Sequence, residues 1–132
     1  MKKKTHLNNT YLVQGSRFML VGVLNGVIGL GTTYAAYNLF NVPYPLANVL
    51  GYTLGLINSF ILNKKWTFQS KKDPKKEIIL FLLIFGVSYS LNLGSVVVSV
   101  ELLHLDPNLA QLVGIFFYTS SNFFGNKLLT FR

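Results

Sequence analysis

Four long stretches that are almost free of charge constrain this chain more than any other feature of its sequence. They cover residues 18–40, 44–62, 78–100 and 109–126. Each is about 18 to 23 residues long, the length that an α-helix needs to cross roughly 30 Å of hydrocarbon. Only 12% of the 132 residues are charged and 51% are hydrophobic, too few charges to cover a soluble globule. The sequence therefore predicts an all-α membrane protein with four transmembrane helices.

A soluble bundle of buried helices is the main alternative, and the lengths of the two shorter stretches do not exclude it. A helix at the surface of a soluble protein needs a polar face, which these stretches mostly lack. The opening MKKK could begin a secretory signal, but the apolar run is too long and no A-x-A cleavage site follows. We therefore expect residues 1–16 to form a cytoplasmic lead-in and residues 17–132 to form the transmembrane domain.

The positive charges are placed asymmetrically along the chain, whose formal net charge is +8. All twelve lysines and arginines lie before the first stretch, between the second and third, or after the fourth. The loops at residues 41–43 and 102–108 carry none. Because positive loops stay in the cytoplasm, both termini and the middle loop are predicted to be cytoplasmic. This placement favours contact with anionic lipid over binding of nucleic acid.

An internal repeat links the two halves of the chain. Residues 58–68 read NSFILNKKWTF and residues 122–131 read NFFGNKLLTF, which align at an offset of 63 positions. Each half, at about 17–68 and 80–131, holds two predicted spans, so both halves enter the membrane in the same direction. The sequence therefore predicts two parallel two-helix repeats. The matched pairs include Phe18 with Phe81, Ala47 with Ala110, Gly51 with Gly114, Asn63 with Asn126, Lys64 with Lys127, Thr67 with Thr130, and Phe68 with Phe131.

The sequence offers no set of residues for catalysis. It has no cysteine, no phosphate-binding glycine loop and no metal-ligand cluster. The histidines His6 and His104 are predicted on opposite sides of the membrane. The carboxylates are not paired, since Asp73 and Glu77 are expected in the middle loop, with Glu101 and Asp106 on the far side. We therefore expect a protein that is not an enzyme and that carries neither a metal nor a cofactor.

Asparagine side chains at membrane depth are the most informative polar groups. At the helical rise, Asn25 lies about 12 Å inward of Arg17, and Asn58 about 9 Å inward of Lys64. An amide without a partner is costly in hydrocarbon, so these side chains should face the helix bundle or a cavity. They could simply hold helices together. Alternatively, cations at the rim would hold a phosphate while amides bind a polar head such as a sugar.

The second reading defines a candidate site. Trp66 is the expected aromatic residue at the membrane interface. Glu101 either sits in the opposite interface or serves as an outward release or proton-coupling group. The candidate phosphate ligands are Arg17, Lys64, Lys65 and Lys127, and the candidate polar path comprises Asn25, Asn58, Asn63, Asn92, Asn122, Asn126 and Glu101.

Three sequence motifs resemble the GtrA family of small four-span bacterial membrane proteins. They are Arg17-Phe18 with Val21-Gly22 and Asn25, then NSFILNKKWTF, then NFFGNK at residues 122–127. The resemblance implies movement of polyprenyl-phosphate-linked sugars, such as undecaprenyl-phosphate glucose, from the cytoplasmic to the outer leaflet. There they would serve glycosylation of surface polymers such as teichoic acid, O-antigen or arabinan. Leu129 replaces the tryptophan that the repeat would place there, and the glycine at Gly86 is shifted, which leaves the role of the second half open.

Two other functions are compatible with these patterns. The chain could be a scaffold that recruits a polyprenyl-phosphate glycosyltransferase to the cytoplasmic face. A four-span multidrug exporter would need a carboxylate within the membrane, and the first span has none. For the translocation reading we expect a polyprenyl-phosphate sugar as ligand, the bacterial cytoplasmic membrane as location, and a homodimer or a partner complex as assembly.

Overall fold

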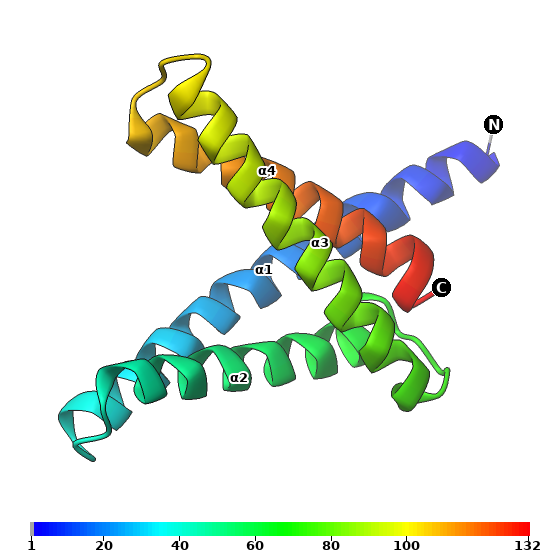
Figure 1. Cartoon of the computed structure of the whole chain (residues 1–132). Coiled ribbons are helices and arrows are strands. Elements are labelled where there is room, and N and C mark those ends of the chain that lie inside the picture. The colour runs from blue at the N-terminus through cyan, green and yellow to red at the C-terminus, as the bar shows by residue number, and fades with distance from the viewer. Residues whose placement is uncertain (1) are drawn as a thin grey trace. The chain divides into compact units, whose positions relative to one another are not determined.

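The computed structural model describes the backbone of residues 2–132 and the side chains from Thr10 onward. Every regular element in this part of the chain is a helix (Figure 1). The chain divides into two compact units, Met1–Ser70 (unit 1) and Lys71–Arg132 (unit 2). Unit 1 contains α1 (Lys2–Asn38), α2 (Tyr44–Leu62) and the π-helical turn η1 (Asn63–Thr67); unit 2 contains α3 (Pro74–Glu101), α4 (Pro107–Gly125) and the π-helical turn η2 (Asn126–Thr130).

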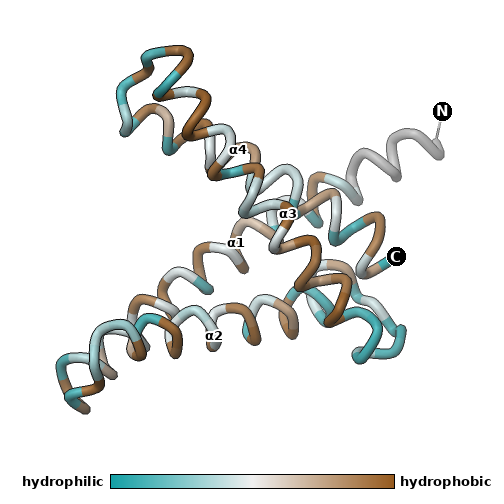
Figure 2. The backbone as a smooth tube through the Cα atoms, in the orientation of Figure 1, coloured by the Kyte–Doolittle hydropathy of each residue, from teal (hydrophilic) through white to brown (hydrophobic). Residues whose placement is uncertain are grey.

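Three of the helices are long and apolar enough to cross a membrane. They are α1 from Thr10 to Asn38, α2 with η1 from Tyr44 to Thr67, and α3. Hydrophobic residues run along these helices, whereas the connection between α2 and α3 is hydrophilic (Figure 2). The helix α4 has 19 residues but falls outside this group. Polar side chains such as Gln111 and Asn122 lower its hydropathy, and its role as a fourth span stays a prediction.

Large apolar side chains lie on the outside of the helices. Leu30 and Phe40 are each 75% exposed, and many other leucines, valines and phenylalanines are similarly exposed. Small residues fill the packed positions instead, with Ala47 and Ala110 both fully buried. In water such a surface would be unfavourable, whereas in hydrocarbon it is matched by lipid tails.

Glycines bring the two helices of unit 1 into close contact. A side-chain Cβ at Gly51 on α2 would collide with the carbonyl oxygen of Gly29 and with Thr33 Oγ1 on α1. A Cβ at Gly55 would lie 3.5 Å from the carbonyl oxygen of Asn25. The backbones of α1 and α2 therefore approach each other directly, as small residues allow in membranes.

Unit 2 has the same kind of contact with different partners. A Cβ at Gly114 on α4 would lie 2.6 Å from Val96 Cγ2 and 3.2 Å from Asn92 Nδ2 on α3. Asn92 and Val96 are the positions that the sequence offset pairs with Gly29 and Thr33. Thr33 and Val96 both contribute side chains, but the Asn92 side chain in unit 2 lies where unit 1 has the backbone carbonyl of Gly29.

The element boundaries recur at the same sequence offset. Both hairpin turns contain a non-glycine residue in the left-handed region, Asn41 and His104, each with φ of 53°. The Phe18 and Phe68 rings lie 6.2 Å apart at 53°, and the Phe81 and Phe131 rings 6.3 Å apart at 52°. Each unit thus closes the far end of its hairpin with one phenylalanine pair. The orientation of the two repeats and of the termini in the membrane stays a prediction.

The start of α3 corrects one detail of the sequence reading. We expected Pro74 to belong to a loop that ends before residue 78, but Pro74 begins the helix, a position that proline tolerates. Asp73 caps this end, because its Oδ1 accepts a hydrogen bond from the backbone N of Lys75 at 3.0 Å. Glu77 was therefore placed wrongly in the loop. It lies in the first turn of α3 and is only 2% exposed.

At the other end of the chain, α1 runs without a break from Lys2 to Asn38. The backbone of the predicted lead-in is thus continuous with the first span. His6 lies outside the side chains that the structure describes.

Candidate functional site

An arginine and a tryptophan join α1 to η1 at one end of unit 1. Arg17 Nη1 donates a hydrogen bond to the backbone oxygen of Trp66 at 3.0 Å. The guanidinium carbon also lies 5.3 Å from the centroid of the Trp66 ring, a cation–π distance. Arg17 and Lys64 are half-buried, whereas Lys65 is exposed. A guanidinium has five N–H donors, so the bond to Trp66 leaves Arg17 with donors for an anion.

Two predicted path residues meet directly in the interior of unit 1. Asn58 Nδ2 donates a hydrogen bond to Asn25 Oδ1 at 2.7 Å. This amide pair bridges α1 and α2, and so fulfils the helix-joining role that we had kept open. The bond does not use Asn25 Nδ2 or Asn58 Oδ1. The pair can therefore bridge the helices and still offer a donor and an acceptor to a polar ligand.

The π-helical turn η1 holds two buried polar side chains. Asn63 and Thr67 are each 1% exposed. Asn63 Nδ2 donates to Ser59 Oγ at 3.2 Å, but Asn63 Oδ1 and Thr67 Oγ1 have no hydrogen-bond partner. The backbone N of Phe68 donates to the Asn63 carbonyl at 2.9 Å across the widened turn. Such turns are rare and often occur at functional sites.

Turn η2 repeats this arrangement in unit 2. Asn126 Nδ2 donates to the carbonyl oxygen and to Oδ1 of Asn122, at 2.9 and 2.8 Å. Asn126 Oδ1 and Thr130 Oγ1 have no hydrogen-bond partner. Lys127 is half-buried, with its Nζ 5.9 Å from the centroid of the Phe123 ring. Each unit therefore places a half-buried lysine beside a buried asparagine and threonine with unpaired oxygens.

The remaining predicted residues lie elsewhere in their units. Asn92 packs against Gly114 between α3 and α4, and Glu101 is exposed at the last position of α3. From Thr10 onward, the chain contains no group of three or more metal-ligating side chains.

Sequence reasoning missed Thr67, Thr130 and Ser88 as site residues. All three are buried, and none of their hydroxyl oxygens has a hydrogen-bond partner. The signal for the two threonines was present, because they coincide in the repeat. Their burial depends on the π-helical turns, which no simple helical pattern predicts.

The Thr67 hydroxyl can be tested through stability. Thr67→Val keeps the shape of the side chain, and we expect its melting temperature in detergent to match that of the wild type. Thr67→Ala removes a buried methyl group and should cost about 1 kcal/mol. An equal loss of stability in both variants would show that the hydroxyl does have a partner in the folded protein. Thr130→Val is the matched variant in unit 2.

Long apolar helices, an exposed apolar surface and small residues at the helix contacts define a multi-pass α-helical membrane protein. Residues 17–131 match the family described as GtrA/DPMS, transmembrane domain. The chain belongs to this family.

Two similar proteins come from Bacillus subtilis (strain 168). The uncharacterized membrane protein YngA is 32% identical over 122 residues, which cover 87% of this chain and 77% of YngA. The uncharacterized membrane protein YwcD is 24% identical over 119 residues, which cover 87% of this chain and 94% of YwcD. The similarity thus extends over most of the length of each protein.

Proposed function

We propose that this protein translocates a polyprenyl-phosphate-linked hexose, with undecaprenyl as the lipid, from the cytoplasmic to the outer leaflet of a bacterial cytoplasmic membrane. One observation carries the proposal. The half-buried cations Arg17 and Lys64 lie at one end of unit 1, and the Asn25–Asn58 amide pair lies about 9 to 12 Å deeper. Membership of the GtrA/DPMS transmembrane-domain family supports it, because resemblance to the GtrA proteins implies movement of such lipids.

The chemistry of a polyprenyl-phosphate sugar matches this arrangement of cations at one end of unit 1 and amides deeper in it. A polyprenyl-phosphate sugar has an apolar tail that stays in the bilayer and a charged head that must leave water to cross. Lysine and arginine hold the phosphate through charge-assisted hydrogen bonds. Amides and buried hydroxyls then offer hydrogen bonds to the sugar, which lowers the cost of moving it through hydrocarbon. No covalent bond changes in this process.

The biological role and the partners that we propose follow from the same ligand. The sugar delivered to the outer leaflet would serve glycosylation of cell-wall or surface polysaccharide such as teichoic acid. The enzyme that makes the lipid-linked sugar, a polyprenyl-phosphate glycosyltransferase, would be the natural partner. Four helices give a thin wall around a phosphosugar, so a homodimer or a complex with that partner would complete the path.

Reconstitution into liposomes tests the proposal. The full chain is placed in vesicles with a short-chain polyprenyl-phosphate hexose, and the appearance of the head group on the opposite side is followed over time. We expect the protein to accelerate crossing over protein-free vesicles. Asn58→Ala should slow it by up to about tenfold, the effect of one lost hydrogen bond. Thermal melting of the variant checks that it remains folded without the bridge to Asn25.

A non-transporting scaffold is the second candidate, and the exposed lysines at the start of unit 2 favour it. Lys71 and Lys72 precede α3, and Lys75 and Lys76 lie in its first turn, all of them exposed. An acidic glycosyltransferase surface or an anionic lipid surface would match this cluster. Folded protein that gives no acceleration would overturn translocation and favour the scaffold.

A further inference from the structure

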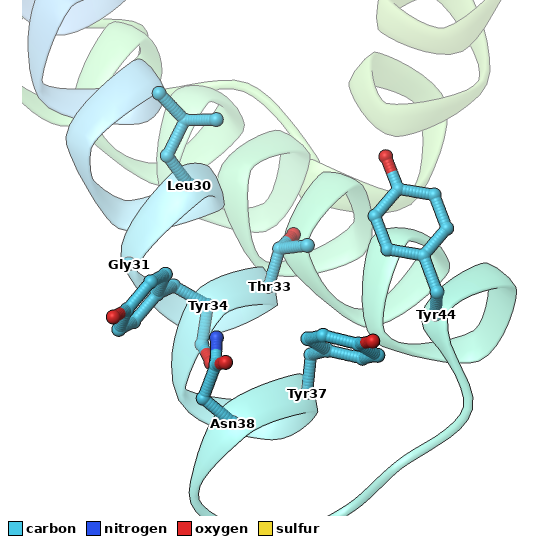
Figure 3. Close-up of a pocket in the computed structure, with 7 residues that line it drawn as sticks. All are labelled: Leu30, Gly31, Thr33, Tyr34, Tyr37, Asn38 and Tyr44. Carbon is cyan, nitrogen blue, oxygen red and sulfur yellow. The ribbon is translucent and has the colours of Figure 1, made fainter.

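A hollow of about 520 Å³ lies in unit 1, at the end of α1 remote from Arg17. Figure 3 shows the residues that line it. It is formed by the last turns of α1 and the first residue of α2. Its position on α1 is about 25 Å from Arg17 at the helical rise, on the side that the charge asymmetry predicts to be outside the cell. Its volume is within the range of small-molecule sites. The lining residues are Leu30, Gly31, Thr33, Tyr34, Tyr37, Asn38 and Tyr44.

Three tyrosines give this hollow its character. The Tyr37 and Tyr44 rings meet edge to face, with centroids 6.0 Å apart at 90°. Tyr34 and Tyr44 are 70% and 59% exposed, so the hollow is open on one side. Within the described part of the chain, the three phenolic hydroxyls form no hydrogen bond. Asn38 Nδ2 donates to the carbonyl oxygen of Tyr34 at 3.0 Å, which leaves Asn38 Oδ1 as a further acceptor.

The lining contains no charged side chain. A phosphate would find no counter-ion there. Aromatic faces and an aliphatic side chain surround a few hydroxyl and amide groups instead. A pyranose ring has the complementary surface, since its C–H face stacks on aromatic rings and its hydroxyl groups both donate and accept hydrogen bonds.

The sequence of unit 2 indicates that a helix pair of this kind forms without these tyrosines. At the 63-residue offset, Val97 replaces Tyr34, Val100 replaces Tyr37, and Pro107 replaces Tyr44. Unit 2 nevertheless forms the same hairpin with the same turn geometry. A general need for aromatic residues at the membrane interface would apply to both hairpins equally.

We propose that this hollow binds the neutral hexose ring of the lipid-linked sugar at the outer end of unit 1. The inference rests on the proposed function and deepens it by adding a receiving site for the sugar, separate from the cations at the opposite end. In this arrangement the phosphate of the lipid lies outside the hollow, where no cation binds it. The site therefore binds the sugar without also holding the charged phosphate.

Saturation-transfer NMR on the full chain in detergent or nanodiscs tests the site. Methyl glucoside is the probe, because it carries the neutral ring without phosphate or lipid. We expect saturation transfer to the ring protons of the glucoside for the wild type. The double variant Tyr34→Val with Tyr37→Val, which installs the residues found in unit 2, should bind about tenfold more weakly. Tyr52→Val, an exposed tyrosine on α2 outside the hollow, should retain the wild-type signal.

The possible results of this experiment distinguish sugar binding at the hollow from translocation of the lipid. Absence of transfer to the glucoside in the wild type would overturn the site, as would equal transfer in the wild type and the double valine variant. A loss of signal in Tyr52→Val as large as in the double variant would also overturn it, because it would reveal a nonspecific aromatic effect. Transfer that depends on Tyr34 and Tyr37, together with no acceleration in liposomes, would retain the sugar site and overturn the proposed translocation.

Discussion

Lys64→Gln is expected to slow crossing of the head group about ten- to hundredfold in the liposome assay. The substitution keeps a polar side chain of similar length but removes the charge that would hold the phosphate. A charge-assisted hydrogen bond contributes about 1.5–3 kcal/mol, which corresponds to this range of rates. Lys64 is half-buried beside the buried Asn63, so water screens its charge less than at an exposed site.

The matched control is Lys71→Gln, which removes the same charge from an exposed position outside the helices. We expect its crossing rate to stay within about twofold of the wild type, because surface charges are well screened. Equal rates for both variants and the wild type would contradict a role for Lys64 in holding phosphate. An equal reduction in both would instead indicate a general effect of charge on lipid recruitment.

Gly51→Ala is expected to disrupt the helix pair of unit 1. The added Cβ would occupy the space of the Gly29 carbonyl oxygen and of Thr33 Oγ1. Because a helix backbone cannot move aside as a side chain can, α1 and α2 must separate. Overpacking of this kind typically costs 1–3 kcal/mol, about the size that lowers the melting temperature by several degrees. Thermal unfolding in detergent, followed by circular dichroism, measures the change.

Two other glycines serve as controls. Gly22→Ala should leave stability unchanged or slightly raise it, since nothing lies within 4 Å of its added Cβ and alanine favours helix. Gly114→Ala should fall between the two, because its neighbours are the side chains of Val96 and Asn92, which can adjust. A loss at Gly51 no larger than at Gly114 would show that the helices of unit 1 are not in backbone contact.

Much of the helical framework was predictable because it follows from local chemistry. The boundaries of α2 were predicted to the residue, and α4 begins within two residues of the start of the predicted fourth stretch. The repeat paired Gly51 with Gly114, and in the structure each of them lies at a close contact between the two helices of its unit. The charge-free lengths also predicted a membrane protein, and α1, α2 and α3 meet that description.

The parts that were missed depend on tertiary structure. Glu77 belongs to a charged sequence that is typical of a loop, yet the Asp73 cap and Pro74 start a helix early enough to bury it. The π-helical turns bury Thr67 and Thr130. The residue types in these two segments do not predict that the helix widens there. Tyr34, Tyr37 and Tyr44 were not singled out from the sequence, because only the hairpin turn brings Tyr44 back beside Tyr37.

The phenylalanine pair that closes each hairpin also bears on how the protein is made. Phe18 meets Phe68 within residues 1–70, so every contact of the first pair is available before Phe81 has been synthesised. Chains are inserted from the N-terminus, and compact units generally fold as they emerge. The bilayer can thus receive the first hairpin as a finished unit, while the lysine-rich connection, which the charge pattern predicts to be cytoplasmic, stays on the ribosome's side.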